Sequence, residues 1–136
     1  PFLISSCLLG VMAQRLLRKV CSSCAEPDVL NADQIMALDA PLPLLSGGPR
    51  FLKGAGCTNC RGTGFRGRTA VFEMVGMSSQ LRAEIARQST LAEMTSLART
   101  AGFRTLRESA VRKLAAGVTS YDEVMRMTSA NSAIAR

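Results

Sequence analysis

The 136-residue sequence predicts an α+β protein, mainly α, in which a small tetracysteine subdomain with short strands precedes a C-terminal bundle of about three to four helices. Three observations support this class. Two Cys-x-x-Cys pairs lie in residues 21–68, a stretch that has few apolar residues. One β-rich run, Thr69–Val75, follows the second pair. Beyond that run, capping residues repeatedly precede amphipathic helical patterns.

We expect residues 1–20 to form the end of a buried strand and an amphipathic helix. Phe2–Ile4 are apolar, and Ser5 or Ser6 can cap a following helix. A helix over residues 7–20 places apolar side chains on one face and basic ones in its last turn, which the helix dipole favours. Its apolar positions are Leu9, Ala13, Leu16 and Val20.

Capping signals predict the remaining helices. Asn31 with Gln34 three residues later forms a capping box, which predicts a short helix over Ala32–Leu38. Residues 40–50 are rich in proline and glycine and should form an irregular connection. Four more capped segments follow, and Gly117 ends the third at the usual C′ position. These helices are expected over residues 79–87, 91–100, 106–116 and 120–127.

The elements suggest an N-terminal piece, residues 1–20, a tetracysteine subdomain, residues 21–76, and a helical subdomain, residues 77–128. Residues 129–136 show no periodicity and should form a flexible tail. The first residue is Pro1 rather than Met, which suggests a piece of a longer protein. Polar residues interrupt the apolar start of the chain well short of a membrane span, and we expect no transmembrane segment.

Composition narrows the possible functions. The chain is 47% hydrophobic and only 4% aromatic, so we expect a core built mostly from aliphatic side chains. Its formal charge of +7 favours acidic partners such as nucleotides, nucleic acids or an anionic membrane surface. There is no histidine, which removes the commonest general base. The sequence also lacks a P-loop motif, and it contains no residue pattern typical of a catalytic site.

The cysteines predict a metal site. Two pairs with the same spacing are formed by Cys21, Cys24, Cys57 and Cys60. Each pair can form a tight knuckle whose thiolates point to one side, and two knuckles make a tetrahedral cage. This is the closed geometry of a structural zinc site, with no position left for a catalytic water. Zinc would supply much of the folding energy of this segment.

Other arrangements of the cysteines are possible, although we favour zinc. Two disulfides would need an oxidising compartment and would leave Cys7 unpaired. A thioredoxin-type pair usually lies between a strand and the start of a helix, whereas Cys21 would follow a helix here. Cys7 lies on the apolar face of the predicted helix, and we expect it to be a buried core thiol rather than a ligand.

Glycines and arginines follow the second cysteine pair. Gly62, Gly64 and Gly67 would allow the positive φ and close backbone approach that a chain reversal around a metal requires. Backbone N–H groups there could donate to the cysteine sulfurs. Three arginines lie among these glycines: Arg61, Arg66 and Arg68. They could offset the negative charge of a four-thiolate zinc site, or they could bind a phosphate or an acidic partner; the sequence leaves both uses open.

Three segments stand out together: GVMAQRLLRKVCSSC, GCTNCRGTGFRGRTAVFEMV and AAGVTSYDEVMRMT. In this order they resemble the C-terminal end of the type II secretion ATPases and the related type IV pilus assembly ATPases, over about residues 1–128. The Arg-Gly-Arg-Thr run is more similar to the secretion branch. Retraction ATPases of the pilus system lack the tetracysteine.

The resemblance implies that residues 1–20 are the end of a RecA-like ATPase domain and that the four cysteines bind zinc. The nucleotide-binding elements of the family lie upstream, so ATP and magnesium would bind only in the parent protein. That parent would be a hexameric cytoplasmic ATPase, peripheral at the inner membrane, which powers pseudopilus assembly for protein secretion.

The implied partners are the rest of the ATPase, neighbouring subunits and inner-membrane platform components, with Arg61, Arg66 and Arg68 as candidate contacts. The resemblance implies no nucleic-acid partner and no small-molecule substrate for this piece.

The residues also allow functions other than the one that the resemblance implies. A nucleic-acid-binding zinc ribbon suits the charge, but Phe65 and Phe72 are too few aromatics for a stacking platform. The CTNCRGTG run fits heat-shock co-chaperone repeats, whereas CSSCAEPD does not. A redox enzyme would need thiols that react in the native state.

Overall fold

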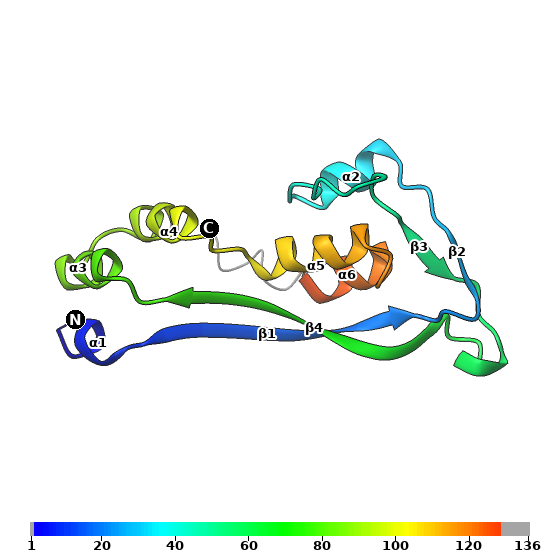
Figure 1. Ribbon diagram of the computed structural model, residues 1–136, viewed down its shortest axis with the longest axis horizontal. Helices are drawn as coiled ribbons and strands as arrows, with labels where there is room; N and C mark the ends of the chain where they lie inside the picture. Colours follow the sequence, from blue (N-terminus) through cyan, green and yellow to red (C-terminus); the bar gives the residue numbers. More distant parts are fainter. Residues whose placement is uncertain (1, 129–136) are drawn as a thin grey trace. The chain divides into compact units, whose positions relative to one another are not determined.

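The computed structural model describes residues 2–128, over which it has six α-helices and four β-strands (Figure 1). The predicted mixed α+β class is confirmed. None of the helices in this range is long and apolar enough to cross a membrane. The predicted tail, residues 129–136, lies outside the described residues.

The N-terminal segment differs from the prediction. Helix α1, Phe2–Cys7, replaces the expected strand end, and strand β1, Gly10–Val20, replaces the expected helix. The strand pairs with β4, Phe65–Gly76, in a two-stranded sheet. Only Leu17 is buried along β1, so burial imposes little alternation of apolar and polar side chains on its sequence. Pairing with a partner distant in the sequence decides its conformation.

Strand β4 contains the predicted strand Thr69–Val75 and extends it at both ends. The pairing with β1 is antiparallel. The Met77 N–H donates to the Leu9 carbonyl at 3.0 Å beyond one end of the ladder, and the Cys21 N–H donates to the Gly64 carbonyl at 2.9 Å beyond the other. The sheet therefore leads directly into both cysteine pairs.

The described chain forms two compact units. The first contains residues 2–13 and 72–105, and with them α1, α3 (Ser79–Arg87) and α4 (Leu91–Thr100). Helix α3 packs against both α1 and α4. The predicted caps are confirmed here: Ser78 accepts from the N–H of Leu81, and Thr90 and Glu93 form a capping box.

The second unit contains residues 14–71 and 106–128. Strands β2 (Ala25–Pro27) and β3 (Leu52–Gly54) pair antiparallel. Three helices belong to this unit: α2 (Ala32–Ala37), α5 (Leu106–Ala115) and α6 (Tyr121–Thr128). Their core is aliphatic, as predicted, and its fully buried side chains include Leu17, Leu38, Val111, Leu114 and Val124.

The predicted helix ends in this unit agree with the structure to within a residue or two. Asn31 and Gln34 make both hydrogen bonds of the capping box at α2. Gly117 has a φ of 70° just after α5, as a C′ glycine requires. Residues 40–50 form no helix or strand. The predicted boundaries between domains, after residues 20, 76 and 128, refer to the domains of the longer parent protein and stay a prediction.

Candidate metal centre

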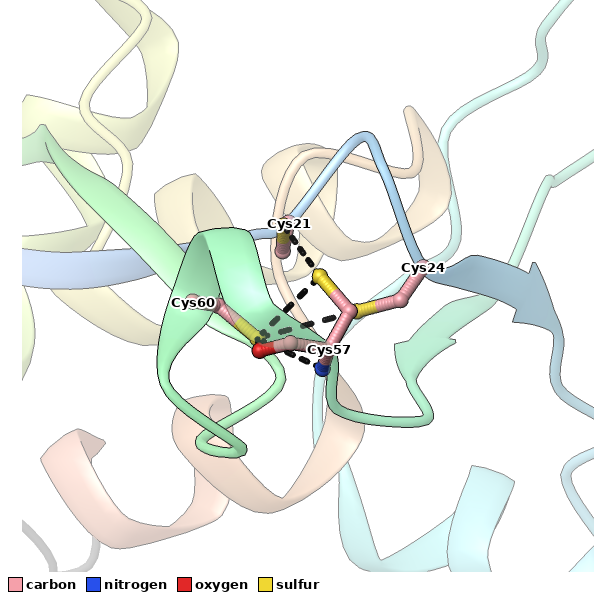
Figure 2. A group of neighbouring side chains, drawn as sticks. All are labelled: Cys21, Cys24, Cys57 and Cys60. Atoms are coloured by element: carbon pink, nitrogen blue, oxygen red, sulfur yellow. Dashed lines mark hydrogen bonds between the residues drawn. The ribbon is translucent and has the colours of Figure 1, made fainter.

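Four cysteine sulfurs converge in the second unit (Figure 2). Cys21 comes directly after β1, and Cys24 comes directly before β2. After β3, Cys57 is the N-cap of a short 3-10 helix, Thr58–Cys60, and Cys60 is the last residue of that helix. All four Sγ atoms lie within 4.8 Å of one another. The structure thus brings together the four cysteines that the sequence singled out.

The distances between the sulfurs match a tetrahedral thiolate site. Cys57 Sγ lies 3.9 Å from Cys21 Sγ and 3.7 Å from Cys60 Sγ, and Cys24 Sγ lies 3.8 Å from Cys60 Sγ. With metal–sulfur bonds of about 2.3 Å, tetrahedral ligands are roughly 3.8 Å apart. A disulfide would need sulfurs about 2.05 Å apart. All the cysteines are free thiols, so this arrangement suits a four-coordinate metal ion rather than disulfides.

The surroundings of Cys21 change one argument from the sequence. Cys21 follows a strand and not the predicted helix. The cysteine pair is nevertheless followed by β2, whereas a thioredoxin-type pair opens a helix.

Cys7 was also predicted wrongly: it is exposed at the end of α1, because the apolar helix face that would have buried it does not form.

Backbone donors stabilise the Cys60 thiolate. The N–H groups of Cys57 and Gly64 each lie 3.2 Å from Cys60 Sγ. Burial disfavours the charged form, but these donors outweigh it and lower the pKa of the Cys60 thiol to about 6. The contact from Gly64 is the kind of N–H···S hydrogen bond that the glycine-rich segment suggested.

Cys24 shows the opposite effect. Burial and hydrogen bonds to the other three sulfurs raise the pKa of the Cys24 thiol to about 12, although Gly56 donates a backbone hydrogen bond to it. A bound metal would displace the thiol protons, as thiolate ligation requires.

Hydrogen bonds join the two knuckles directly. The Asn59 side-chain amide donates to the Ser23 hydroxyl at 3.0 Å, across the two Cys-x-x-Cys turns. The Ala55 N–H donates to the Cys24 carbonyl at 3.0 Å. Thr63 Oγ1 donates to the Cys60 carbonyl at 2.7 Å and holds the chain as it leaves the second knuckle. Hydrogen bonds outside the cysteine sulfurs therefore hold the two knuckles in place.

Gly64 lies where two backbones touch. It has a φ of 74°, and a Cβ on it would lie 2.5 Å from the Gly54 carbonyl oxygen. The predicted positive φ is confirmed here and at Gly62 and Gly67. Arg61 also adopts a left-handed conformation, with a φ of 54°, which the sequence did not suggest.

The three arginines near the second knuckle are exposed. Arg68 lines an open hollow together with Arg18, Thr63, Phe65 and Gly67. In the part of the chain that the structure describes, none of the three arginines makes an ion pair with an acidic side chain. The structure does not bring their guanidinium groups into hydrogen-bond contact with the cysteine sulfurs. Their role as a partner contact stays a prediction.

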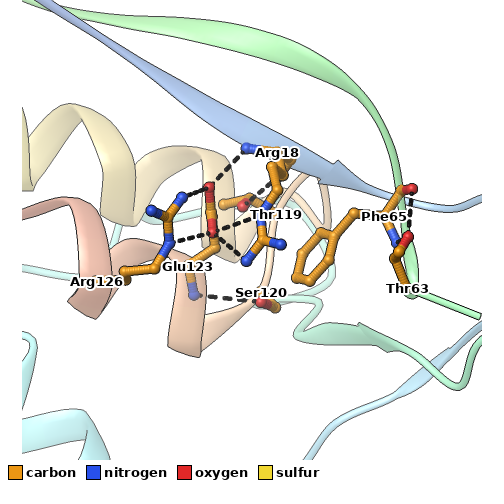
Figure 3. Close-up of polar contacts among 7 residues, drawn as sticks. All are labelled: Arg18, Thr63, Phe65, Thr119, Ser120, Glu123 and Arg126. Atoms are coloured by element: carbon orange, nitrogen blue, oxygen red, sulfur yellow. Dashed lines mark hydrogen bonds and ion pairs between the residues drawn. The ribbon is translucent and has the colours of Figure 1, made fainter.

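Sequence reasoning missed an ionic cluster around the buried carboxylate of Glu123 (Figure 3). The Glu123 side chain on α6 is fully buried. Its carboxylate accepts from Arg18 Nε at 2.9 Å and from Arg126 Nε at 3.0 Å. The Arg18 guanidinium also lies over the Phe65 ring, 4.1 Å from its centroid. The spacing of Glu123 and Arg126 was the only signal, since Arg18 comes from a strand that was expected to be a helix.

The pKa of Glu123 reflects this cluster. Burial alone would raise the pKa of the carboxyl. Hydrogen bonds from Arg126 and Arg18 outweigh burial and lower the pKa to about 2. Glu123 is therefore ionised at neutral pH and bonded to both arginines.

Comparisons with known proteins identify the family of this chain. A model of the Type II/IV secretion system protein family matches residues 1–126. The Type II secretion system protein E of Pseudomonas aeruginosa is 39% identical over 94% of this chain and 25% of its own length. The Type IV pilus assembly ATPase PilB of Thermus thermophilus is 36% identical over 94% of this chain and 14% of its own.

The Type II secretion system ATPase E of Vibrio cholerae is also 36% identical, over 94% of this chain and 25% of its own length. The chain thus spans a quarter or less of these relatives. The family match nevertheless covers almost the whole chain, with all four cysteines inside it. The chain belongs to the type II/IV secretion system protein family.

Proposed function

We propose that this chain is the C-terminal metal-binding and helical portion of a hexameric ATPase that powers type II protein secretion through pseudopilus assembly. The observation that carries this proposal is the convergence of four cysteine sulfurs in a chain of this family. The relatives are named as secretion system proteins and as a secretion ATPase.

In this proposal a structural zinc ion is held by Cys21, Cys24, Cys57 and Cys60. The ion would fix the two knuckles in place of a larger apolar core. Four thiolates close the coordination sphere, so no position remains for substrate or water. Other groups of the chain orient the ligands. Gly64 and Cys57 donate their backbone N–H groups to the Cys60 sulfur, and the Asn59 side chain links one knuckle to the other by a hydrogen bond.

ATP and magnesium belong to the remaining part of the parent protein in this proposal, because this sequence has no P-loop motif. The portion described here acts as a structural and interaction module, cytoplasmic and peripheral at the inner membrane. Its partners are neighbouring ATPase subunits and inner-membrane platform components. Arg61, Arg66 and Arg68 are exposed beside the metal centre and would meet an acidic surface on such a component.

A second candidate function is type IV pilus assembly. Two relatives support it: the pilus assembly ATPase of Thermus thermophilus and that of Acinetobacter baylyi, which is 34% identical over 93% of this chain. The two candidates share the metal centre and differ in the filament that the ATPase assembles.

A test compares Cys57→Ser with Cys7→Ser in the full-length ATPase. Cys57 belongs to the cysteine cluster, whereas Cys7 is exposed outside it, so the second variant controls for loss of a thiol. We expect Cys57→Ser to lose zinc and secretion of the cognate cargo, while Cys7→Ser keeps both. Normal secretion by Cys57→Ser, with its zinc lost, would contradict the proposed role of the metal centre. Lost pilus assembly with normal secretion would favour the second candidate.

A further inference from the structure

The turn between α5 and α6, residues 115–120, contacts both chain segments that lead into the cysteine pairs. We call these residues the α5–α6 turn. Its backbone is tightly closed: the Gly117 N–H donates to the Leu114 carbonyl at 2.9 Å, and the Val118 N–H donates to the Lys113 carbonyl at 3.0 Å. Thr119 and Ser120 within it are buried.

The first contact is with the end of β1, directly before Cys21. The Val20 N–H donates to the Val118 carbonyl at 3.0 Å. The Thr119 hydroxyl donates to the Arg18 carbonyl at 2.8 Å. The Val118 carbonyl and the Thr119 hydroxyl thus form hydrogen bonds with backbone groups of β1 that point away from β4. These bonds fix the direction in which the chain enters the first knuckle.

Glu123, in the first turn of α6, completes this contact. Its Oε1 atom accepts from the backbone N–H of Arg18 at 2.9 Å, in addition to the side-chain bonds described above. Figure 3 shows Thr119 and Glu123 on the same side of Arg18. A fully buried carboxylate with five nitrogen atoms within 3.0 Å of its oxygens is costly to displace. The end of β1 is therefore held at two residues, Arg18 and Val20, through three backbone groups.

The second contact is with the segment that leads to Cys57. The Arg50 N–H donates to the Ala115 carbonyl at 2.7 Å. Gly117 lies so close to the start of β3 that a Cβ on it would be 2.9 Å from Leu52 Cδ1 and 3.2 Å from the Arg50 carbonyl oxygen. Strand β3 then runs from Leu52 to Gly54, three residues before Cys57.

We propose that the α5–α6 turn is a positioning device for the metal centre: it holds both approaches to the cysteine pairs, so retention of the metal is coupled to docking of this turn. The inference rests on the proposed metal centre. Groups that orient metal ligands from outside the coordination sphere commonly change metal affinity when they are lost. Because coupling is reciprocal, the metal also stabilises the turn.

Thr119→Val tests this coupling, because it keeps the shape of the side chain and removes the hydroxyl that donates to Arg18. We expect the zinc-loaded 136-residue chain to release zinc to a chromogenic chelator roughly tenfold faster than the wild type. Thr119→Ser, which keeps the hydroxyl, should restore slow release.

Thr90→Val is the matched control, because Thr90 caps α4, which belongs to the other compact unit. It should release zinc at the wild-type rate. Equal release by all four proteins, each carrying one zinc, would overturn the coupling and leave the metal centre intact. A wild-type chain that binds no zinc would overturn the metal centre itself, and this inference with it.

Amide hydrogen exchange on the wild type gives an answer that does not depend on the folding of any variant. We expect removal of zinc by a chelator to speed exchange at the amides of Val20, Arg50 and Gly117, whose hydrogen bonds belong to the turn or its contacts. Exchange in α3 and α4 should change little. Unchanged exchange at these three amides, with zinc fully removed, would contradict the proposal.

Discussion

Gly64 shows how one residue shapes the candidate metal centre. Its backbone lies against that of Gly54, and its N–H group donates to the Cys60 sulfur. A side chain here would therefore push β3 away from the start of β4 and move a donor that stabilises a thiolate. Gly62, two residues earlier, has a similar φ of 76° but nothing within 4 Å of the position a Cβ would take.

This pair of glycines allows a matched prediction. Gly64→Ala should destabilise the zinc-loaded protein more than Gly62→Ala, because both incur the strain of positive φ, on the order of 1–2 kcal/mol, and only the first adds a clash. Urea unfolding with zinc present measures the difference. Equal losses of stability would mean that the Gly54–Gly64 contact contributes nothing.

At the scale of elements, the contact between α6 and β1 depends on a single buried carboxylate. Glu123 bonds to the backbone and side chain of Arg18 and to the side chain of Arg126. The lowered pKa of Glu123, about 2 compared with a usual value of 4.5, means that ionisation stabilises the folded state. This stabilisation is fully present above pH 4.5 and is lost as the pH falls towards 2.

We therefore predict that Glu123→Gln lowers the free energy of unfolding at pH 6, on the order of 3 kcal/mol from the pKa shift alone. The difference between variant and wild type should shrink as the pH falls from 4.5 to 2, since the wild-type carboxyl then takes up a proton. Chemical unfolding of both proteins across this pH range measures it. A difference that stays constant with pH would show that the charge of Glu123 is not the cause.

Elements differed in how far the sequence could predict them. Helices with local capping signals, such as the Asn31/Gln34 and Thr90/Glu93 boxes, were predicted almost to the residue because their determinants lie within one turn. Strand β1 was predicted as a helix, because its conformation depends on β4, far along the chain. The ionic cluster at Glu123 was missed for the same reason: Arg18 reaches it only from a strand.

At the scale of the whole molecule, the cysteine cluster was predictable because ligand type and spacing are local signals, whereas the way both approaches meet at the α5–α6 turn was not. Within residues 21–68, the buried hydrophobic side chains other than cysteines are Leu30 and Leu38. We infer that the metal takes the place of a core there, which links folding of this unit to metal binding.

The central claim is that four cysteines hold one zinc ion. We would measure zinc by mass spectrometry in the 136-residue chain, purified without added metal, together with a count of reactive thiols before and after chelation. We predict one zinc per chain, one reactive thiol from exposed Cys7, and four more thiols once zinc is removed. No metal, and no free thiol apart from Cys7 even under chelation, would mean two disulfides and would contradict the metal centre.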